Sequence, residues 1–405
     1  MKKIELLTLS IVTATLIVAT GCSDDDDTKQ ASGPSAPSES STPVELNESV
    51  ARNAVALIFG DSNGIRPAPK RGISFDSNSS QNGTSVRDCD IEGEQTTHTS
   101  SVNTDLGNGN WSVVEVKDIT YDNCIDVSDS PAYDTITKTG YDNSTVHVSY
   151  DAETSWVTEE ERWDAHYTFV SENNTTKESN TDNYSITEES TLVYEEFAKI
   201  AIVPKSAQVR RVDPRKMVSM HEYTSGEVKN FNSDEDGNVT DGFHAIVNIT
   251  IDGEYVNSGS TSQKLTFNGF SADYDMNSSG EKLTASEYYN NYVIHWYRPD
   301  PDNANEQAIK VSGTIGDLCL GGSITITTDP VIHSNQSDYK DKNDASGHSV
   351  LPYSGVQQIS GSNDMSITFD YNTTMNTSAT VKIGDTSMTY GTWSELLAGS
   401  SCNAD

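Results

Sequence analysis

The sequence has little positive charge and few hydrophobic residues. It contains 26 Lys and Arg against 61 Asp and Glu, so the formal net charge at pH 7 is −35. A surface of this sign repels phosphate backbones, which excludes nucleic acid as a partner. Hydrophobic residues make up 34% of the chain, which is low for a globular protein. We therefore expect a folded body with a thin core, built from sheets that have one solvated face.

The short motifs of common catalytic sites are also missing. The sequence has no HExxH zinc motif, no P-loop and no CxxC pair. The eight histidines are scattered singly along the chain. Carboxylates are so abundant that spacing alone does not single out an acid pair of the glycosidase type. The sequence therefore gives no positive sign of an enzyme.

The N-terminus has the layout of an export signal. Lys2 and Lys3 precede an apolar run from Leu6 to Ala19, and small residues lead from there to Cys22. The run is short for a membrane span and is typical of a cleaved signal peptide. We predict a signal peptide over residues 1–21. The alternative is an ordinary signal followed by a coincidental cysteine.

The residues Ala19-Thr20-Gly21-Cys22 resemble the lipobox of bacterial lipoproteins, with Ala19 where that family usually has Leu. The resemblance implies cleavage after Gly21 and acylation of Cys22. In Gram-negative lipoproteins an Asp directly after the cysteine favours the inner membrane, and Ser23 stands there in this chain. The resemblance thus implies a lipid anchor in the outer membrane, with the body facing the periplasm or the cell exterior. The body resembles exported Gram-negative lipoproteins in general style and matches no named family by motif.

A solvated segment follows the lipidation site. Residues 24–27 are four consecutive Asp residues, and residues 28–42 are rich in Ser, Pro, Gly and Thr. Such a composition buries too little to offset the entropy of ordering the chain. We predict that residues 22–42 form a lipidated flexible tether. An acidic arm that binds a partner is the alternative.

The cysteine count predicts disulfides. Five cysteines are present, and Cys22 is assigned to the lipid, which leaves an even set of four in an exported chain. Three pairings are possible. We favour Cys89 with Cys124 and Cys319 with Cys402, because each pair closes one plausible sheet unit.

The hydropathy pattern predicts an all-β body of mainly antiparallel sheets, either a sandwich or an open half-barrel. Residues from Val86 onward alternate with period two and contain hairpin signals such as Leu106 to Asn110 and Gly384-Asp385. Asp252-Gly253 also has turn composition. One helix is predicted over residues 43–59, starting with a capping box at Thr42, and a short helical turn is predicted over residues 393–397.

These elements suggest three segments in the body. Residues 43–85 are the helix and an irregular linker, residues 86–204 a first antiparallel unit, and residues 205–405 a second. The boundary is placed at residues 204–215 because two prolines and a basic cluster interrupt the strand pattern there. One continuous twisted sheet is the competing layout.

One acidic loop has the composition of a calcium site. Asn232, Asp234 and Asp236 alternate ahead of Gly237, which matches the first part of an EF-hand-like loop. The position of the bidentate Glu is occupied by Phe243, and the flanks read as strands. An ordinary acidic hairpin turn is the alternative. Calcium is accordingly the one cofactor that the sequence suggests.

Together these features predict an outer-membrane lipoprotein with a non-catalytic binding or structural role in the cell envelope. Its expected contact with the membrane is through the lipid, and the sequence does not identify a protein, glycan or lipid partner. A cell-surface ligand carrier or sugar/calcium-binding module is the first alternative. A hydrolase of envelope polymers is the second.

Overall fold

The computed structural model describes most of the body of the protein. The described residues are 35–60, 82–128, 134–153, 156–172, 179–195, 216–234, 238–256, 262–300, 306–328, 332–335, 354–371, 377–392, 395–396, 398, 400 and 402. The predicted signal peptide, Cys22 and the predicted boundary at residues 204–215 lie outside them.

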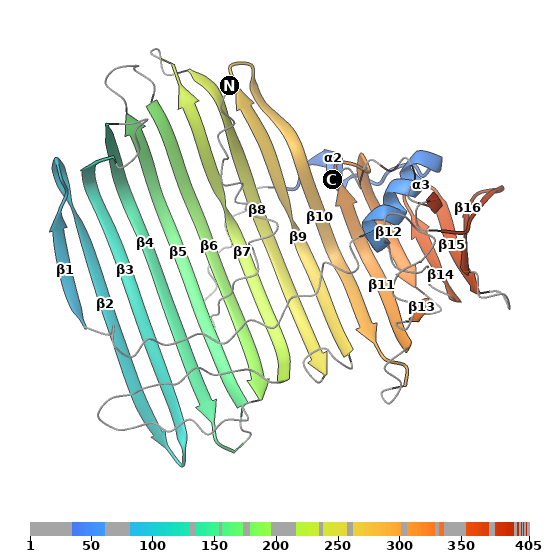
Figure 1. Ribbon diagram of the computed structural model, residues 1–405, viewed down its shortest axis with the longest axis horizontal. Helices are drawn as coiled ribbons and strands as arrows, with labels where there is room; N and C mark the ends of the chain where they lie inside the picture. Colours follow the sequence, from blue (N-terminus) through green and yellow to red (C-terminus); the bar gives the residue numbers. More distant parts are fainter. Residues whose placement is uncertain are drawn as a thin grey trace.

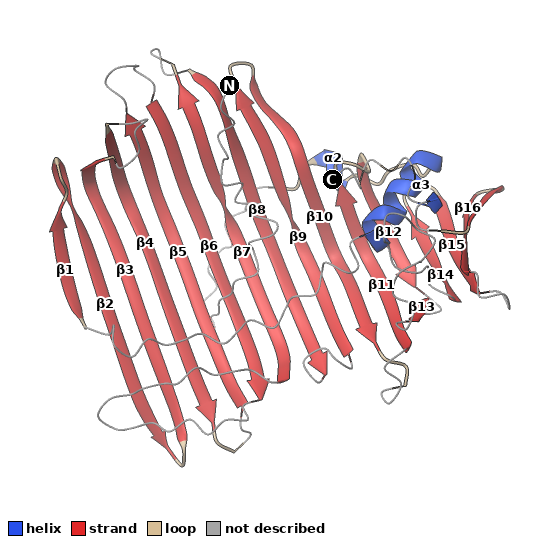
Figure 2. Cartoon of the chain, in the orientation of Figure 1, coloured by secondary structure: helices blue, strands red, loops and turns tan. Residues whose placement is uncertain are grey.

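The body is an antiparallel β-meander, which confirms the all-β prediction (Figures 1 and 2). The first strands are β1 Gly83–Asp88, β2 Glu92–Gly107, β3 Asn110–Val127, β4 Thr135–Asp151, β5 Trp156–Glu172, β6 Ser179–Glu195, β7 Lys216–Ser233, β8 Val239–Val256, β9 Ser262–Asn277 and β10 Gly280–Tyr297. They continue into β11 Glu306–Asp317, β12 Gly322–Thr328, β13 Ile332–Asn335, β14 Ser354–Ser360, β15 Asp364–Tyr371, β16 Thr377–Ile383 and β17 Thr386–Tyr390. Strands β2 to β10 are 16 to 18 residues long, which corresponds to about 55 Å each.

Hydrogen bonding does not divide the sheet at the predicted boundary. β6 and β7 lie on either side of residues 196–215 and pair along their whole length, from Ser179↔Ser233 to Glu195↔Lys216. β12 and β13 both lie along β11, and β14 continues the series. The pairing therefore favours the competing layout of one continuous sheet.

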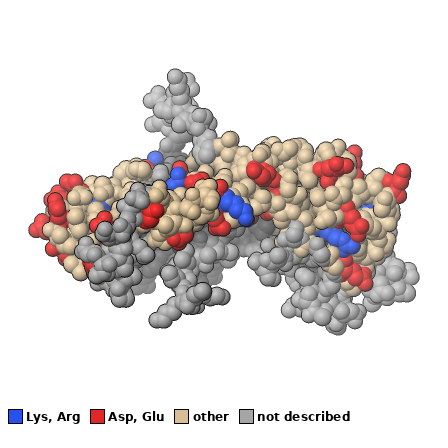
Figure 3. All heavy atoms as spheres, turned by 90° about the horizontal axis from the view of Figure 1, so that it is seen from above, with Lys and Arg blue, Asp and Glu red and all other residues tan. Residues whose placement is uncertain are grey.

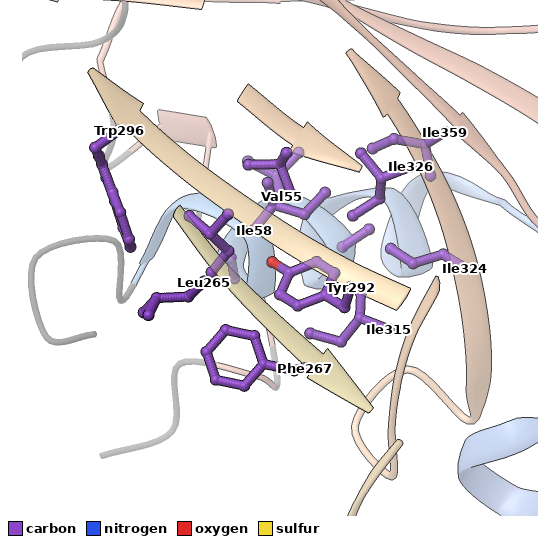
Figure 4. Packing of buried hydrophobic residues seen from close by; sticks show 14 of the residues in the cluster. Val55, Ile58, Leu265, Phe267, Tyr292, Trp296, Ile315, Ile324, Ile326 and Ile359 are labelled. Atoms are coloured by element: carbon purple, nitrogen blue, oxygen red, sulfur yellow. The ribbon is translucent and has the colours of Figure 1, made fainter. Parts of the chain in front are cut away.

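The core is a band across one face of this sheet. Cross-strand register places Leu265, Ile294 and Val311 in one row, and α3 (Glu48–Val55) with the π-helical turn η1 (Ala56–Gly60) packs on that face. Figure 4 shows Val55 and Ile58 among side chains from β9 to β12 and β14. The same cluster extends to Trp111, Val113, Val148 and Val157 on β3 to β5. Burying each large apolar side chain contributes about 1.5–3 kcal/mol.

Three local predictions at the N-terminal side and in β8 are corrected. The helix begins at Glu48, not at residue 43, because Asn47 accepts hydrogen bonds from the amides of Ser49 and Val50 and is the N-cap. Residues 38–42 belong to the body, since α2 (Ser38–Ser41) contacts β10 to β12. The predicted turn at 252–253 lies inside β8, where Gly253 pairs with Met220 and Leu265.

The other local predictions are confirmed where the structure describes them. The β2–β3 and β16–β17 hairpins turn at the predicted residues. Near the C-terminus, the amide of Leu396 donates to the carbonyl of Thr392, which is a helical bond within the predicted turn.

Acidic side chains are spread along the whole visible side of the elongated body, with few basic ones between them (Figure 3). In the part of the chain that is described, none of the helices combines the length and the apolar character needed to cross a bilayer.

Candidate functional site

The junction between the N-terminal segment and the sheet is the first candidate site, since any N-terminal anchor acts on the body through it. After α2 the chain is extended and pairs with the start of β12: the amide of Ser323 donates to Thr42 O at 2.7 Å, and the amide of Val44 donates to Ser323 O at 3.0 Å. Further on, the Nδ2 group of Asn363 donates to Leu46 O at 2.8 Å, and the amide of Leu46 donates to Asn363 Oδ1. The segment therefore occupies backbone positions that a strand would otherwise take.

Glycines permit this close approach. A Cβ at Gly316 would overlap the carbonyl oxygen of Ser40, and one at Gly361 would overlap the carbonyl oxygen of Val44. A Cβ at Gly322 would likewise overlap the carbonyl oxygen of Thr42. Carbonyl oxygens of alternate residues thus fit against three glycines that lie far away in the sequence, and no side chain could replace them without displacing the segment.

Helix α3 is fastened to the C-terminal segment by polar side chains. The Nδ2 group of Asn53 donates to Cys319 O at 2.8 Å, and the hydroxyl of Ser400 donates to Asn53 Oδ1 at 3.0 Å. Arg52 donates to the carbonyl oxygens of Glu395 and Ala398 at 3.1 and 3.0 Å. Its guanidinium also lies 5.1 Å from the ring centre of Tyr390. Helix α3 and the C-terminal segment therefore form one structural unit.

The four body cysteines pair as predicted. Cys89 is bonded to Cys124, and Cys319 to Cys402, with Cα–Cα distances of 5.4 and 5.3 Å. Next to the first bridge, Arg87 forms a bidentate ion pair with Asp126 at 2.9 and 2.7 Å. The hydrogen bonds from Arg87 lower the pKa of Asp126 below its usual value. In the described ranges, the two places where three metal-ligating groups converge both include one of these bridges, so their sulfurs are already bonded.

The predicted calcium loop is placed only in part. Asn232 is the next-to-last residue of β7, and its side-chain amide donates to Asp241 Oδ2 on β8 at 3.0 Å. Asp234 accepts from the backbone amide of Asn238 at 2.8 Å and from its side chain. Asp236 lies outside the described residues. The placed contacts are those of a hairpin turn, in which the carboxylate of Asp234 satisfies the turn backbone.

Three of the histidines form cross-strand pairs with carboxylates. Nδ1 of His147 lies 2.6 Å from Glu160 Oε2, and Nδ1 of His221 lies 2.7 Å from Asp252 Oδ1. His244 is buried and stacked on Tyr274, with Glu281 at 3.0 Å on one side and Glu227 at 3.1 Å on the other. These are the contacts of histidines packed on or within the sheet.

A carboxyl pair on the inner face was not found from the sequence. Glu287 on β10 and Asp317 on β11 are directly paired residues, and the hydroxyl of Tyr289 donates to Glu287 Oε2 at 2.9 Å. The amide of Cys319 donates to Asp317 Oδ1 at 2.7 Å. Burial raises the pKa of Asp317 above its usual value. The two carboxyls are 30 residues apart (317 − 287), so only the β10–β11 register reveals them.

We expect Asp317→Asn to stabilise the protein at neutral pH. The raised pKa means that the folded state holds this proton more tightly than the unfolded state, so the charged carboxylate lowers stability above that pKa. Asn keeps an oxygen acceptor for the amide of Cys319 without the charge. In urea unfolding at pH 7 the midpoint should rise, and the gain should shrink as the pH falls through the pKa of Asp317. The exposed Asp385, changed to Asn, is the control and should give no such gain; an equal gain from both would contradict the assignment.

Several aromatic side chains of β9 and β10 are part of the core. Trp296 is 5% exposed and Tyr292 is 3% exposed. Phe267, Tyr289 and Tyr292 contact one another with ring centres 5.5 to 6.1 Å apart. Core packing, not stacking on a ligand, accounts for these side chains.

The described residues thus offer a built junction for the N-terminal segment, two disulfides and a half-buried carboxyl pair. This junction can hold the sheet in a fixed orientation relative to the N-terminal segment and leaves the faces and edges of a long sheet available for contacts. Comparison with protein-family models and with curated protein sequences gives no match for this chain.

Proposed function

We propose that this chain is a lipoprotein anchored in the Gram-negative outer membrane through Cys22, and that its sheet has a non-catalytic binding or structural role in the cell envelope. The observation that carries the proposal is the N-terminal sequence, in which a basic start and a short apolar run end at Gly21-Cys22. Acyl chains on Cys22 would hold the mature N-terminus in the bilayer, with about 0.8 kcal/mol for each buried methylene.

The junction supports this role. Cys22 precedes Ser38 by 16 residues (38 − 22), so full extension limits the distance between the lipid and the body to about 55 Å. From Ser38 onward the segment is bound to β11, β12 and the β14–β15 turn, and α3 lies on the core. Force applied at the N-terminus would therefore reach the sheet through a bonded segment.

The hydrolase alternative receives less support. Glu287 and Asp317 are the carboxyl pair that such an enzyme would need, but their described contacts are to Tyr289 and to the backbone of Cys319. These contacts lie within the sheet. For the carrier alternative, Trp296, one of the described aromatic side chains that could bind a sugar, is buried in the core.

The proposal predicts that Cys22→Ser abolishes lipidation. The full chain, expressed in a Gram-negative host, should partition into the detergent phase and should carry the mass of attached acyl chains. The Cys22→Ser variant should lose the acyl mass and the detergent partitioning, while Ser23→Ala, the matched control, should keep both. Equal mass and partitioning of the Cys22→Ser variant and the native chain would refute the anchor. Protease treatment of intact cells would then distinguish the periplasmic from the external orientation.

A further inference from the structure

One edge of the sheet differs from the rest of the molecule in charge and exposure. β1 covers only part of β2, and its pairing ends at Gly83↔Thr99. Residues 102–107 of β2 are all exposed. No charged residue occurs from Gln95 to Thr104, in a chain with a net charge of −35. Natural edge strands usually carry charges, prolines or bulges that prevent pairing with another chain. The open residues 100–107 carry one charge, at Asp105, and no proline, and the register shift of β2 against β3 comes at their end, between Asp105 and Gly107.

Two exposed apolar side chains lie on the open part of β2. Seven large hydrophobic residues are exposed in the described part of the chain, and three of them, Val86, Ile91 and Val127, lie near the other end of β2. Val102 and Leu106 are 55% and 57% exposed, and both lie on the open part of β2. This edge therefore offers apolar contacts as well as a strand backbone.

The open backbone groups can be identified. The amide of Ser101 donates to Asn82 Oδ1 at 2.6 Å, and the Nδ2 group of Asn82 donates to Ser101 O at 3.3 Å, so this position is filled by a side chain. In an antiparallel sheet, alternate residues direct both backbone groups to the same side. Asn103 and Asp105 therefore direct theirs outward like Ser101, and beyond Ser101 no described residue pairs with β2 on that side.

We propose that this edge pairs with the same edge of a second copy of the chain, as antiparallel strands related by a two-fold axis at Thr104. In this register Asn103 pairs with Asp105 of the second copy, which satisfies the open backbone groups of both strands. Val102 then faces Leu106 of the second copy, and the same contact is repeated across the axis. The amide side chain of Asn103 is beside a carboxylate, so the pair brings no like charges together.

The charge of the chain explains why the second copy meets at this edge. Two bodies with a net charge of −35 each repel one another over most of their surfaces, and the open part of β2, where Asp105 is the one charged residue from 100 to 107, is where they can approach. The contact is short. In this register the β2–β3 turn of the second copy lies opposite Ser101, and Asn82, the residue before β1, already binds the backbone of Ser101. Pairing over so few residues is a small interface, and we expect a weak dimer.

A cysteine on the proposed axis tests the pairing. Thr104 faces Thr104 of the second copy in a pair that is not hydrogen-bonded, where the Cβ atoms are about 4.5–5.5 Å apart. The full chain with Thr104→Cys, purified in detergent and oxidised, should form a disulfide-linked dimer on a non-reducing gel. The control is Val256→Cys, at an exposed position at the end of β8. Its dimer yield should be lower by about tenfold or more, since its copies meet only by collision.

A charge at the edge provides the second measurement. Val102→Glu, added to the Thr104→Cys chain, places two more carboxylates in a contact that already holds Asp105 of each copy, and should lower the dimer yield by about tenfold. Val256→Glu in the same background should leave the yield unchanged. Equal yields at positions 104 and 256, a yield at 104 that is unaffected by Val102→Glu, or cross-linking of Thr104→Cys only to a different protein would each overturn the proposal. Unfolding midpoints of the variants identify any loss of dimer yield that is due to misfolding. Sedimentation of the native chain as a monomer at every concentration would also reject the proposed dimer.

Discussion

Replacing both Cys319 and Cys402 with Ser is expected to lower the free energy of unfolding by about 4.5 kcal/mol. The bridge joins residues with a sequence separation of 83, and the loop-closure entropy that it removes from the unfolded chain gives this value. Hydrogen bonds also hold this region, because the carbonyl of Cys319 accepts from Asn53, and Asn53 in turn accepts from Ser400. Without the bridge, α3 and the C-terminal segment keep only these weaker contacts. Urea unfolding of the oxidised protein would measure the loss.

The Cys89–Cys124 bridge provides the comparison. Its sequence separation is 35, for which the same entropy gives about 4 kcal/mol. Its surroundings are also different, since Arg87 and Asp126 form an ion pair beside it and β2 pairs with β3 along the hairpin. We expect the Cys89→Ser, Cys124→Ser variant to lose less stability than the Cys319→Ser, Cys402→Ser variant. A larger loss in the Cys89→Ser, Cys124→Ser variant would show that the pairing of β2 with β3 does not compensate for the missing disulfide.

The sequence predicts the strands well because their pattern is local. Alternation of apolar and polar residues is visible in stretches such as 247–251 and 365–371, and both are strands. The Cys89–Cys124 pairing is also accessible from local signals. The predicted turn at 106–110 folds β2 back on β3, and the resulting register brings Glu92 opposite Ile125, close to both cysteines.

The predicted start of the helix was wrong because residues far away in the sequence determine where the helix begins. Thr42-Pro43-Val44-Glu45 has the composition of a capping box, yet the backbone of this stretch bonds to Ser323 and Ser362. The backbone of the next residue, Leu46, bonds to Asn363. Those partners are roughly three hundred residues away, so no local pattern contains them. Asn47 then takes the capping role that the sequence also allows.

The length of the strands and the inner carboxyl pair were missed for a related reason. A glycine following an Asp has turn composition, but Gly253 lies within β8 because its neighbours on β7 and β9 continue the pairing past it. Glu287 and Asp317 meet only through the register of β10 with β11, which includes a shift between Asn290 and Val293. A period-two pattern gives the face of each residue and not its partner on the next strand.

Gly316→Ala and Gly361→Ala are each expected to destabilise the protein by about 1–3 kcal/mol, the usual cost of adding a methyl group where there is no room. Each new Cβ would overlap a backbone carbonyl oxygen, that of Ser40 at position 316 and that of Val44 at position 361. A backbone atom cannot move aside as a flexible side chain can, so the N-terminal segment must shift as a whole. Gly83→Ala is the control, because its Cβ would meet nothing within 4 Å.

Hydrogen exchange separates this local effect from general destabilisation. The amides of Val44 and Ser323 are bonded across the junction at 3.0 and 2.7 Å, so both should exchange faster in the Gly316 and Gly361 variants. Amides in the centre of β4, far from the junction, should keep their protection relative to the new global stability. If Val44 and Ser323 stayed as protected as in Gly83→Ala, the segment would not depend on the glycines. If the expected loss of amide protection is seen, the glycines are what keep the N-terminal segment hydrogen-bonded to the sheet.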